Sequence, residues 1–175
     1  NGFPNHPHAN MEIITLVLEG ELTHTDSMGN KEVLKPGDMQ IMSAGSGVTH
    51  SEFNHSDEEV KLFQMWIMPK TQDIKPSHKT FSLPTIENEL INIIPDIKKI
   101  EQDAQMSIGK FSTEEEIEVK ANGEGLFVMM IEGTAVVNGQ SVHRRDSIET
   151  TDDLSIKVSA GTYFFILRVP LEQHQ

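Results

Sequence analysis

The chain has 175 residues, no cysteine, and 14 basic against 27 acidic side chains, giving a formal net charge of −13. This length suits one domain or two small ones, with a core large enough to need no disulfide bonds. The lack of cysteine excludes a disulfide scaffold, a thiolate zinc site and a cysteine nucleophile. The acidic balance argues against direct binding to nucleic acid or anionic membranes. No apolar run reaches the length of a membrane span. With no cysteine and no recognisable signal peptide, we expect a protein of the cytoplasm.

Short apolar runs rich in Ile, Val and Phe, each bounded by Gly, Pro or Asp, are typical of buried strands. In chain order they cover residues 11–18, 60–68, 126–131 and 163–169. Asn138-Gly139 predicts a type I′ hairpin, because both turn residues must accept a positive φ. The stretch 83–105 is the least strand-like, and we expect a linker there with room for a short helix. Short strands with turns at this spacing predict an all-β sandwich or barrel.

The two halves of the chain repeat one order of strand, Glu-Gly, hairpin, Asp-containing turn, strand and Ala-Gly. Leu16-Val17-Leu18-Glu19-Gly20 matches Met129-Met130-Ile131-Glu132-Gly133, and Ser43-Ala44-Gly45 matches Ser159-Ala160-Gly161. Such a repeat predicts a duplicated β-barrel. The expected domains are an N-terminal metal-binding barrel over 1–82, the linker over 83–105 and a C-terminal metal-free barrel over 106–175.

Histidines with strand spacing concentrate in the first half. His6 and His8 flank Pro7, and side chains two apart in an extended chain share a face, so both imidazoles can converge on one point. His50 and Glu52 repeat this spacing after a Gly-rich turn. Three imidazoles and one carboxylate suit Fe(II), Mn, Ni, Cu or Zn rather than Ca or Mg. Four such ligands around an octahedral ion leave two positions for water, substrate or O2, as in a catalytic centre.

The other candidate residues have weaker patterns. Glu12, near His8, is either a partner of the ligands or a charge at the start of a strand. The second half has no His-x-His at the corresponding place, so we expect it to be structural. The histidines in polar turns, the linker or the tail, which we do not expect to bind metal, are His24, His55, His78, His143 and His174. The side chains suggested as pocket walls by their proximity in sequence are Phe3, Met11, Met42 and Phe53.

Several of these segments resemble one known family. The segments are Gly2-Phe3-Pro4-Asn5-His6-Pro7-His8, Leu18-Glu19-Gly20, Asp26-Ser27-Met28-Gly29-Asn30 and His50-Ser51-Glu52. They resemble the motifs of the pirin family, and most of all its bacterial members described as quercetin 2,3-dioxygenases. The resemblance covers essentially the whole chain. It implies a bicupin, two jelly-roll β-barrels with one metal in the first, and family members have further N-terminal strands, so the first barrel is expected to be incomplete in this sequence.

The resemblance also implies an activity and a ligand set. The family's metal ligands match His6, His8, His50 and Glu52, and the metal is one divalent transition ion, with Fe(II) favoured. The implied reaction is a dioxygenation in which O2 opens a flavonol such as quercetin and CO is released. Glu52 is then also the catalytic base that accepts the flavonol proton, and the partners are a small aromatic substrate and O2.

A second interpretation is a non-enzymatic, iron-binding regulatory protein that senses redox state and acts through a protein partner, because the family also includes such members. A redox switch predicts a closed metal site. An enzyme predicts a cleft that admits a bicyclic ligand. A sugar-binding cupin isomerase is disfavoured because the pirin motifs are so complete.

Overall fold

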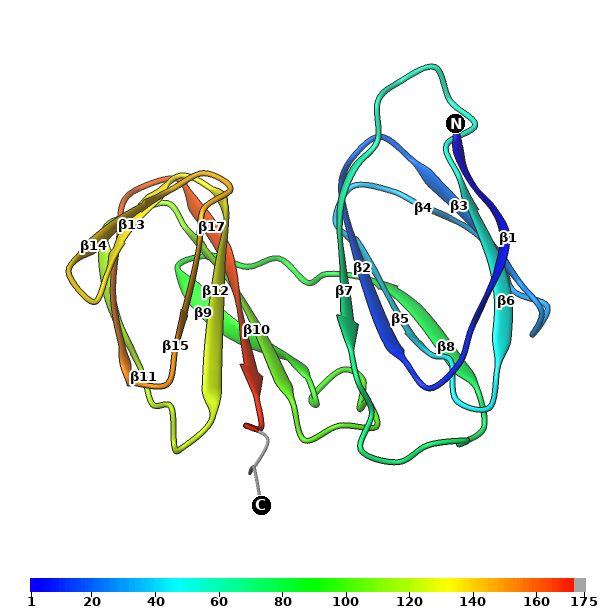
Figure 1. The fold of residues 1–175 in the computed structure, drawn as a ribbon. Helices are drawn as coiled ribbons and strands as arrows, with labels where there is room; N and C mark the ends of the chain where they lie inside the picture. The colour runs from blue at the N-terminus through cyan, green and yellow to red at the C-terminus, as the bar shows by residue number, and fades with distance from the viewer. Residues whose placement is uncertain (172–175) are drawn as a thin grey trace. The chain divides into compact units, whose positions relative to one another are not determined.

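The computed structural model describes residues 1–171, and this part of the chain consists of strands, turns and loops without a helix. His174 therefore lies outside the described residues. The chain forms two compact units, one of residues 1–84 with 100–102, the other of residues 85–99 with 103 onward (Figure 1). The all-β prediction is thus confirmed. Within residues 1–171 there is no helix of the length and apolarity that a membrane crossing requires.

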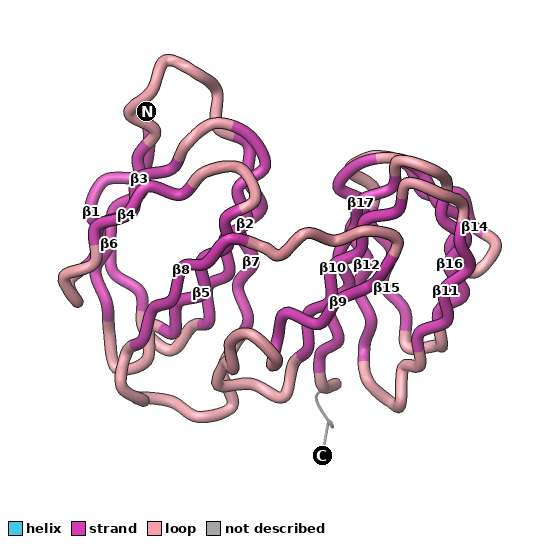
Figure 2. Tube along the Cα trace, turned by 180° about the vertical axis from the view of Figure 1, so that it is seen from behind, coloured by secondary structure: helices cyan, strands magenta, loops and turns pink. Residues whose placement is uncertain are grey.

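The N-terminal unit contains two four-stranded antiparallel sheets, in the orders β1-β6-β3-β4 and β7-β2-β5-β8. In Figure 2 these strands surround the interior of the unit. The strands are β1 (Gly2–His8), β2 (Glu12–Glu19), β3 (Leu22–Asp26), β4 (Lys31–Leu34), β5 (Asp38–Ser43), β6 (Val48–Phe53), β7 (Lys61–Ile67) and β8 (Ser77–Ser82).

Strand β1 carries two prolines, Pro4 and Pro7, and has a partner only on its β6 side. Proline has no N–H to give to a ladder, so an edge strand is where it is tolerated. The register slips by one residue between Phe3 and His6, which is a β-bulge. Such a bulge turns the strand locally and redirects the side chains that follow it. His6 and His8 lie just beyond this bulge.

The interior of the N-terminal unit is unusually polar. Strand β3 alternates, with Leu22, His24 and Asp26 buried and the intervening threonines more exposed. The same unit also has small apolar clusters, for example Val17 with Leu22 and Leu34. Polar side chains and small apolar clusters therefore share the interior of this unit.

The C-terminal unit has a five-stranded antiparallel sheet, β15-β12-β17-β10-β9, and a four-stranded one, β11-β16-β13-β14. The predicted hairpin is confirmed: Val137 pairs with Gln140, and Asn138 and Gly139 have φ of 48° and 82°. The strands are β9 (Glu89–Ile94), β10 (Gln105–Phe111), β11 (Glu115–Val119), β12 (Gly125–Glu132), β13 (Thr134–Val137), β14 (Gln140–His143), β15 (Ser147–Thr150), β16 (Leu154–Val158) and β17 (Thr162–Val169).

The segment expected to be a linker with a short helix has a different structure. Its middle forms β9, which pairs with β10 and so belongs to the C-terminal unit. The β-branched Ile91, Ile93 and Ile94 explain the strand, because such side chains fit a pleated, half-buried surface. The expected helical turns are reduced to one turn at 95–97, closed by the Ile97 N–H donating to the Ile93 carbonyl at 2.9 Å.

Candidate metal centre

Three imidazoles converge on one face of the paired strands β1 and β6. His6 and His50 are direct partners across the two strands, and His8 follows two residues after His6. The Nε2 atoms of His6 and His50 lie 2.9 Å apart. One ring nitrogen from each of the three histidines lies within 4.8 Å of the others. The three rings, with centroids 4.4–4.9 Å apart, are inclined to one another by 58–78°.

This arrangement fits a transition-metal ion. Two nitrogens at about 2.1 Å from one ion and at a right angle to each other are about 3.0 Å apart, close to the observed 2.9 Å. His6 also makes a 2.9 Å hydrogen bond between Nδ1 and the Pro4 carbonyl oxygen, in which the ring nitrogen donates. That bond leaves the Nε2 lone pair of His6 free for an ion, as in many metal-bound histidines.

The surroundings keep two of these imidazoles uncharged. Burial, together with the neighbouring His24, His6 and His8, lowers the pKa of His50 to about 3. Burial and the nearby His6 also lower the pKa of His8. A histidine must be neutral to bind a metal. Both side chains are therefore ready to act as ligands at neutral pH.

Glu52 lies beside this trio rather than within it. Its residue is 4 % exposed, and its carboxylate forms a second group with His50 and His24, again within 4.8 Å. The Gln64 side-chain amide donates to both Glu52 oxygens, at 3.0 Å each. The structure thus brings His6, His8 and His50 together and places Glu52 next to His50, which belongs to both groups.

Sequence reasoning missed a buried cluster behind the trio. His24 Nε2 donates to Asp26 Oδ2 at 3.0 Å, and both side chains are fully buried. The His24 ring stacks on that of His78 with centroids 5.0 Å apart, and it also lies 5.2 Å from the His50 ring. The alternation of Leu22, His24 and Asp26 would have placed His24 on the interior face. His78 had no comparable signal.

Hydrogen bonding explains why Asp26 tolerates burial. Burial by itself raises its pKa, but hydrogen bonds from the Asn30 and His24 side chains and from the Asn30 and Met28 backbone lower the pKa below its usual value. These four bonds occupy both oxygens of the Asp26 carboxylate. The Asp26 carboxylate is therefore already satisfied by the β3-β4 turn and by His24.

Glu12 has no place in this centre. Thr15, three residues further along β2, lies on the side of Gln64 and Glu52, so Glu12 points to the opposite face of the strand. The Glu12 carboxylate instead accepts a 2.6 Å hydrogen bond from the Ser43 hydroxyl. His55 and His143 are exposed and belong to none of the metal-compatible groups among residues 1–171.

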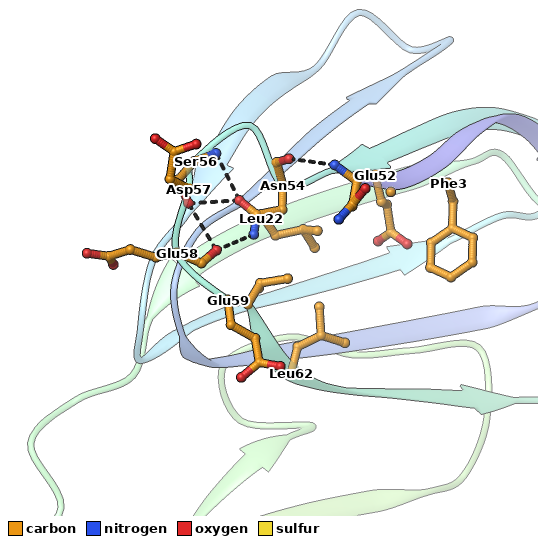
Figure 3. A pocket seen from close by; sticks show the side chains of 12 residues that line it. Phe3, Leu22, Glu52, Asn54, Ser56, Asp57, Glu58, Glu59 and Leu62 are labelled. Carbon is orange, nitrogen blue, oxygen red and sulfur yellow. Dashed lines mark hydrogen bonds between the residues drawn. The ribbon is translucent and has the colours of Figure 1, made fainter.

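A pocket of about 510 Å³ opens on the Glu52 side of the centre. Figure 3 shows Glu52 and Phe3, which are partners across β1 and β6, toward one end of it, and the loop 54–59 toward the other. Of the expected walls, Phe3 lines this pocket, whereas Met42 is fully buried in a core cluster with Ile13.

Two exposed aromatic rings border the imidazoles. Phe3, 67 % exposed, meets His6 edge to face, and Trp66, 58 % exposed, does the same with His8 at 5.3 Å between centroids. Large exposed aromatic surface next to polar groups commonly marks a binding site. His6 and His8, which are themselves partly exposed, therefore lie beside aromatic side chains at the surface.

The C-terminal unit has apolar residues at the matching positions. His24 and Val137 correspond, because each lies four residues after the glycine of its unit's Glu-Gly turn. His24 pairs with Glu52 across the sheet, whereas Val137 pairs with Ile156. Likewise His6 pairs with His50, and Val119 pairs with Leu154. Val137, Leu154 and Ile156 all belong to the hydrophobic core. The duplicated fold therefore carries ligand-type side chains at these positions in its first unit only.

Two similar antiparallel barrels, with a histidine-rich interior in the first, define a bicupin. The sequence comparisons give its family. The profile of the Pirin family matches residues 1–67, and the profile described as the quercetinase C-terminal cupin domain matches residues 96–169. The chain belongs to the pirin family.

Curated relatives agree with this assignment. A quercetin 2,3-dioxygenase of Escherichia coli K12 is 34 % identical over 167 residues, which are 92 % of this chain and 72 % of the relative. A pirin-like protein of Caulobacter vibrioides is 35 % identical over 169 residues, 91 % of this chain and 72 % of the relative. The expected likeness to quercetin 2,3-dioxygenases, which are oxidoreductases, is therefore confirmed.

Solved structures share the fold along the whole chain. YhhW from Escherichia coli superposes with a TM-score of 0.91 at 32 % identity, covering 100 % of this chain and 78 % of that one. The bacterial pirin YhhW in complex with nickel(II) gives a TM-score of 0.89 at 32 % identity, covering 98 % and 77 %. The bicupin prediction is confirmed, and a similar fold binds a divalent transition metal.

Proposed function

We propose that this protein is a metal-dependent dioxygenase that opens flavonols such as quercetin with O2, and that His6, His8, His50 and Glu52 bind its metal. The observation that carries the proposal is the convergence of three imidazoles beside the buried carboxylate of Glu52, a residue that also lines an open pocket. The names of the relatives support the same reaction class. We also propose the cytoplasm as its location, because the chain contains no cysteine.

The ligand set favours one divalent transition ion. Three neutral imidazoles and a carboxylate suit Fe(II), which we propose as the working metal, and they also suit the nickel seen with the relative YhhW. When bound, such an ion supplies Lewis-acid and redox chemistry toward a flavonol hydroxyl and O2. The protein's own part is to orient the imidazoles, through the bulge in β1 and the Pro4 carbonyl.

Glu52 is the proposed catalytic base. Glu52 lines the pocket and its carboxylate lies beside His50, so it can accept the proton of the flavonol 3-hydroxyl while the ring system occupies the pocket. Overall, the flavonol takes up one O2 and releases one CO as its central ring opens. The proton held by Glu52 then returns to the ring-opened product, so the side chain is regenerated.

The shape and lining of the centre favour an aromatic substrate. A pocket of about 510 Å³ lies within the range of about 300–1,000 Å³ typical of small-molecule sites. Phe3, which lines this pocket, and Trp66, which lies outside it, are exposed aromatic side chains in contact with His6 and His8. The partial exposure of His6 and His8 and the pocket beside Glu52 support an enzyme over a redox switch, for which a closed metal site is expected.

The proposal is tested by loading the protein with Fe(II) under anaerobic conditions, adding quercetin and O2, and following O2 uptake and CO release. We expect one CO for each O2, with loss of both on chelation. Bound iron without ring opening would refute the dioxygenase proposal and favour the regulatory alternative with a protein partner.

A further inference from the structure

A chain of hydrogen bonds runs from the surface of the N-terminal unit to Glu52. The Trp66 indole N–H donates to Gln64 Oε1 at 3.1 Å. The Gln64 amide nitrogen then donates to both oxygens of Glu52 at 3.0 Å. Trp66 and Gln64 lie in β7, and Glu52 lies in β6, a strand of the other sheet.

The hydrogen bond from Trp66 fixes the orientation of the Gln64 side-chain amide. An indole N–H is a donor only, so its partner must be the amide oxygen, and the amide nitrogen is turned toward Glu52. The reverse orientation would bring the amide NH2 against the indole N–H and the amide oxygen against a carboxylate. The direction of the chain therefore follows from hydrogen-bond chemistry, which is what decides between the two orientations of a glutamine amide.

The amide nitrogen has more acceptors than hydrogens. Besides the two Glu52 oxygens it reaches the Thr15 hydroxyl oxygen at 3.2 Å. Thr15 faces Gln64 directly across the β2-β7 ladder. Hydrogen bonds to an ionised carboxylate are shorter and stronger than those to a neutral group. Gln64 is thus held at both ends, and Glu52 has few other orientations available.

We infer that Gln64, oriented by Trp66, is a positioning residue that holds the Glu52 carboxylate beside His50. The inference rests on the proposed function, because it gives Gln64 and Trp66 a part in presenting Glu52 to the metal and substrate. Trp66 has a second contact with the centre, since its ring meets that of His8. A single exposed side chain therefore touches one proposed ligand and, through Gln64, fixes another.

Nickel(II) binding to the whole chain, measured by titration calorimetry, provides the first test. Gln64→Met should weaken nickel binding by about 10- to 100-fold, the range found when a residue that orients a metal ligand is lost. Trp66→Phe keeps an aromatic ring but removes the indole N–H, so it should weaken nickel binding several-fold. Because Trp66 is largely exposed, this variant still tests the chain of bonds if Gln64→Met does not fold.

Gln40→Met is the matched control. Gln40 is a buried glutamine that faces Thr15 from the opposite neighbour, β5, so it occupies the same layer of the barrel. Neither atom of its amide has a hydrogen-bond partner in the structure. The same substitution there should leave nickel affinity within twofold of the wild type.

A double-mutant cycle with Glu52→Ala separates positioning from general packing. If Gln64 acts through Glu52, adding Gln64→Met to Glu52→Ala should change nickel affinity less than twofold. An undiminished 10- to 100-fold cost in that background would overturn the inference, as would wild-type affinity in both Gln64→Met and Trp66→Phe. Failure of the wild type to bind nickel would instead refute the proposed metal site.

Discussion

Replacing His50 with leucine should make the metal-free protein more resistant to acid. His50 is 1 % exposed, and its surroundings lower its pKa to about 3, whereas an unfolded histidine titrates at about 6.5. Below about pH 6.5, His50 is protonated in the unfolded chain but stays neutral in the folded one. The free energy of unfolding therefore falls with falling pH until the pKa of the folded state is reached.

The magnitude follows from the two pKa values. Between pH 7.5 and 4.5 the unfolded His50 becomes protonated while the folded one stays neutral, which lowers the free energy of unfolding by about 2.5 kcal/mol. Leucine is a reasonable replacement because the matching position of the C-terminal unit is Leu154. His50→Leu removes this contribution, so the variant should lose about 2.5 kcal/mol less over the same pH range.

The assay is urea unfolding at pH 7.5 and pH 4.5 with chelator present, followed by tryptophan fluorescence. Trp66 is the only tryptophan of the chain and lies in β7, so its signal reports the N-terminal unit. His143→Leu, at an exposed position in the other unit, is the control and should behave as the wild type does. Equal loss of stability in His50→Leu and the wild type would refute the reasoning.

Three further predictions concern the same centre. His6→Ala combined with His50→Ala should abolish nickel binding while the circular dichroism of the strands is retained. Stoichiometric nickel in that protein would refute the proposed site. Glu52→Gln, loaded at a saturating metal concentration, should still hold metal on the three histidines but lose quercetin turnover, because an amide cannot accept the flavonol proton. Unchanged turnover would refute Glu52 as the base. Asp26→Ala removes the acceptor of four hydrogen bonds, so it should lower the free energy of unfolding, measured by urea titration, by about 2–4 kcal/mol. A loss below about 0.5 kcal/mol would contradict that account.

Much of this centre is local in the sequence, which is why it could be predicted. His6 and His8 share a face because they are two residues apart in one strand, and the same holds for His50 and Glu52. The repeat of Glu19-Gly20 in Glu132-Gly133 likewise indicates the duplicated barrel from the order of residues alone. Period-two alternation needs no knowledge of which strands are neighbours.

What could not be predicted depends on strand order. Gln64 reaches Glu52 because β7 lies beside β2 and the two sheets face each other, and His78 reaches His24 from β8, the far edge of that sheet. Neither contact follows from spacing along the chain. The strand β9 was missed for a related reason, since its pairing with β10 outweighs the prolines around it.

The most direct test of the central claim is a crystal structure of the nickel-loaded protein with an anomalous difference map. The account predicts one strong peak within about 2.1 Å of nitrogen atoms from His6, His8 and His50, with a Glu52 oxygen beside it. A peak on His24 and His78 instead, or one in the C-terminal unit, would contradict it.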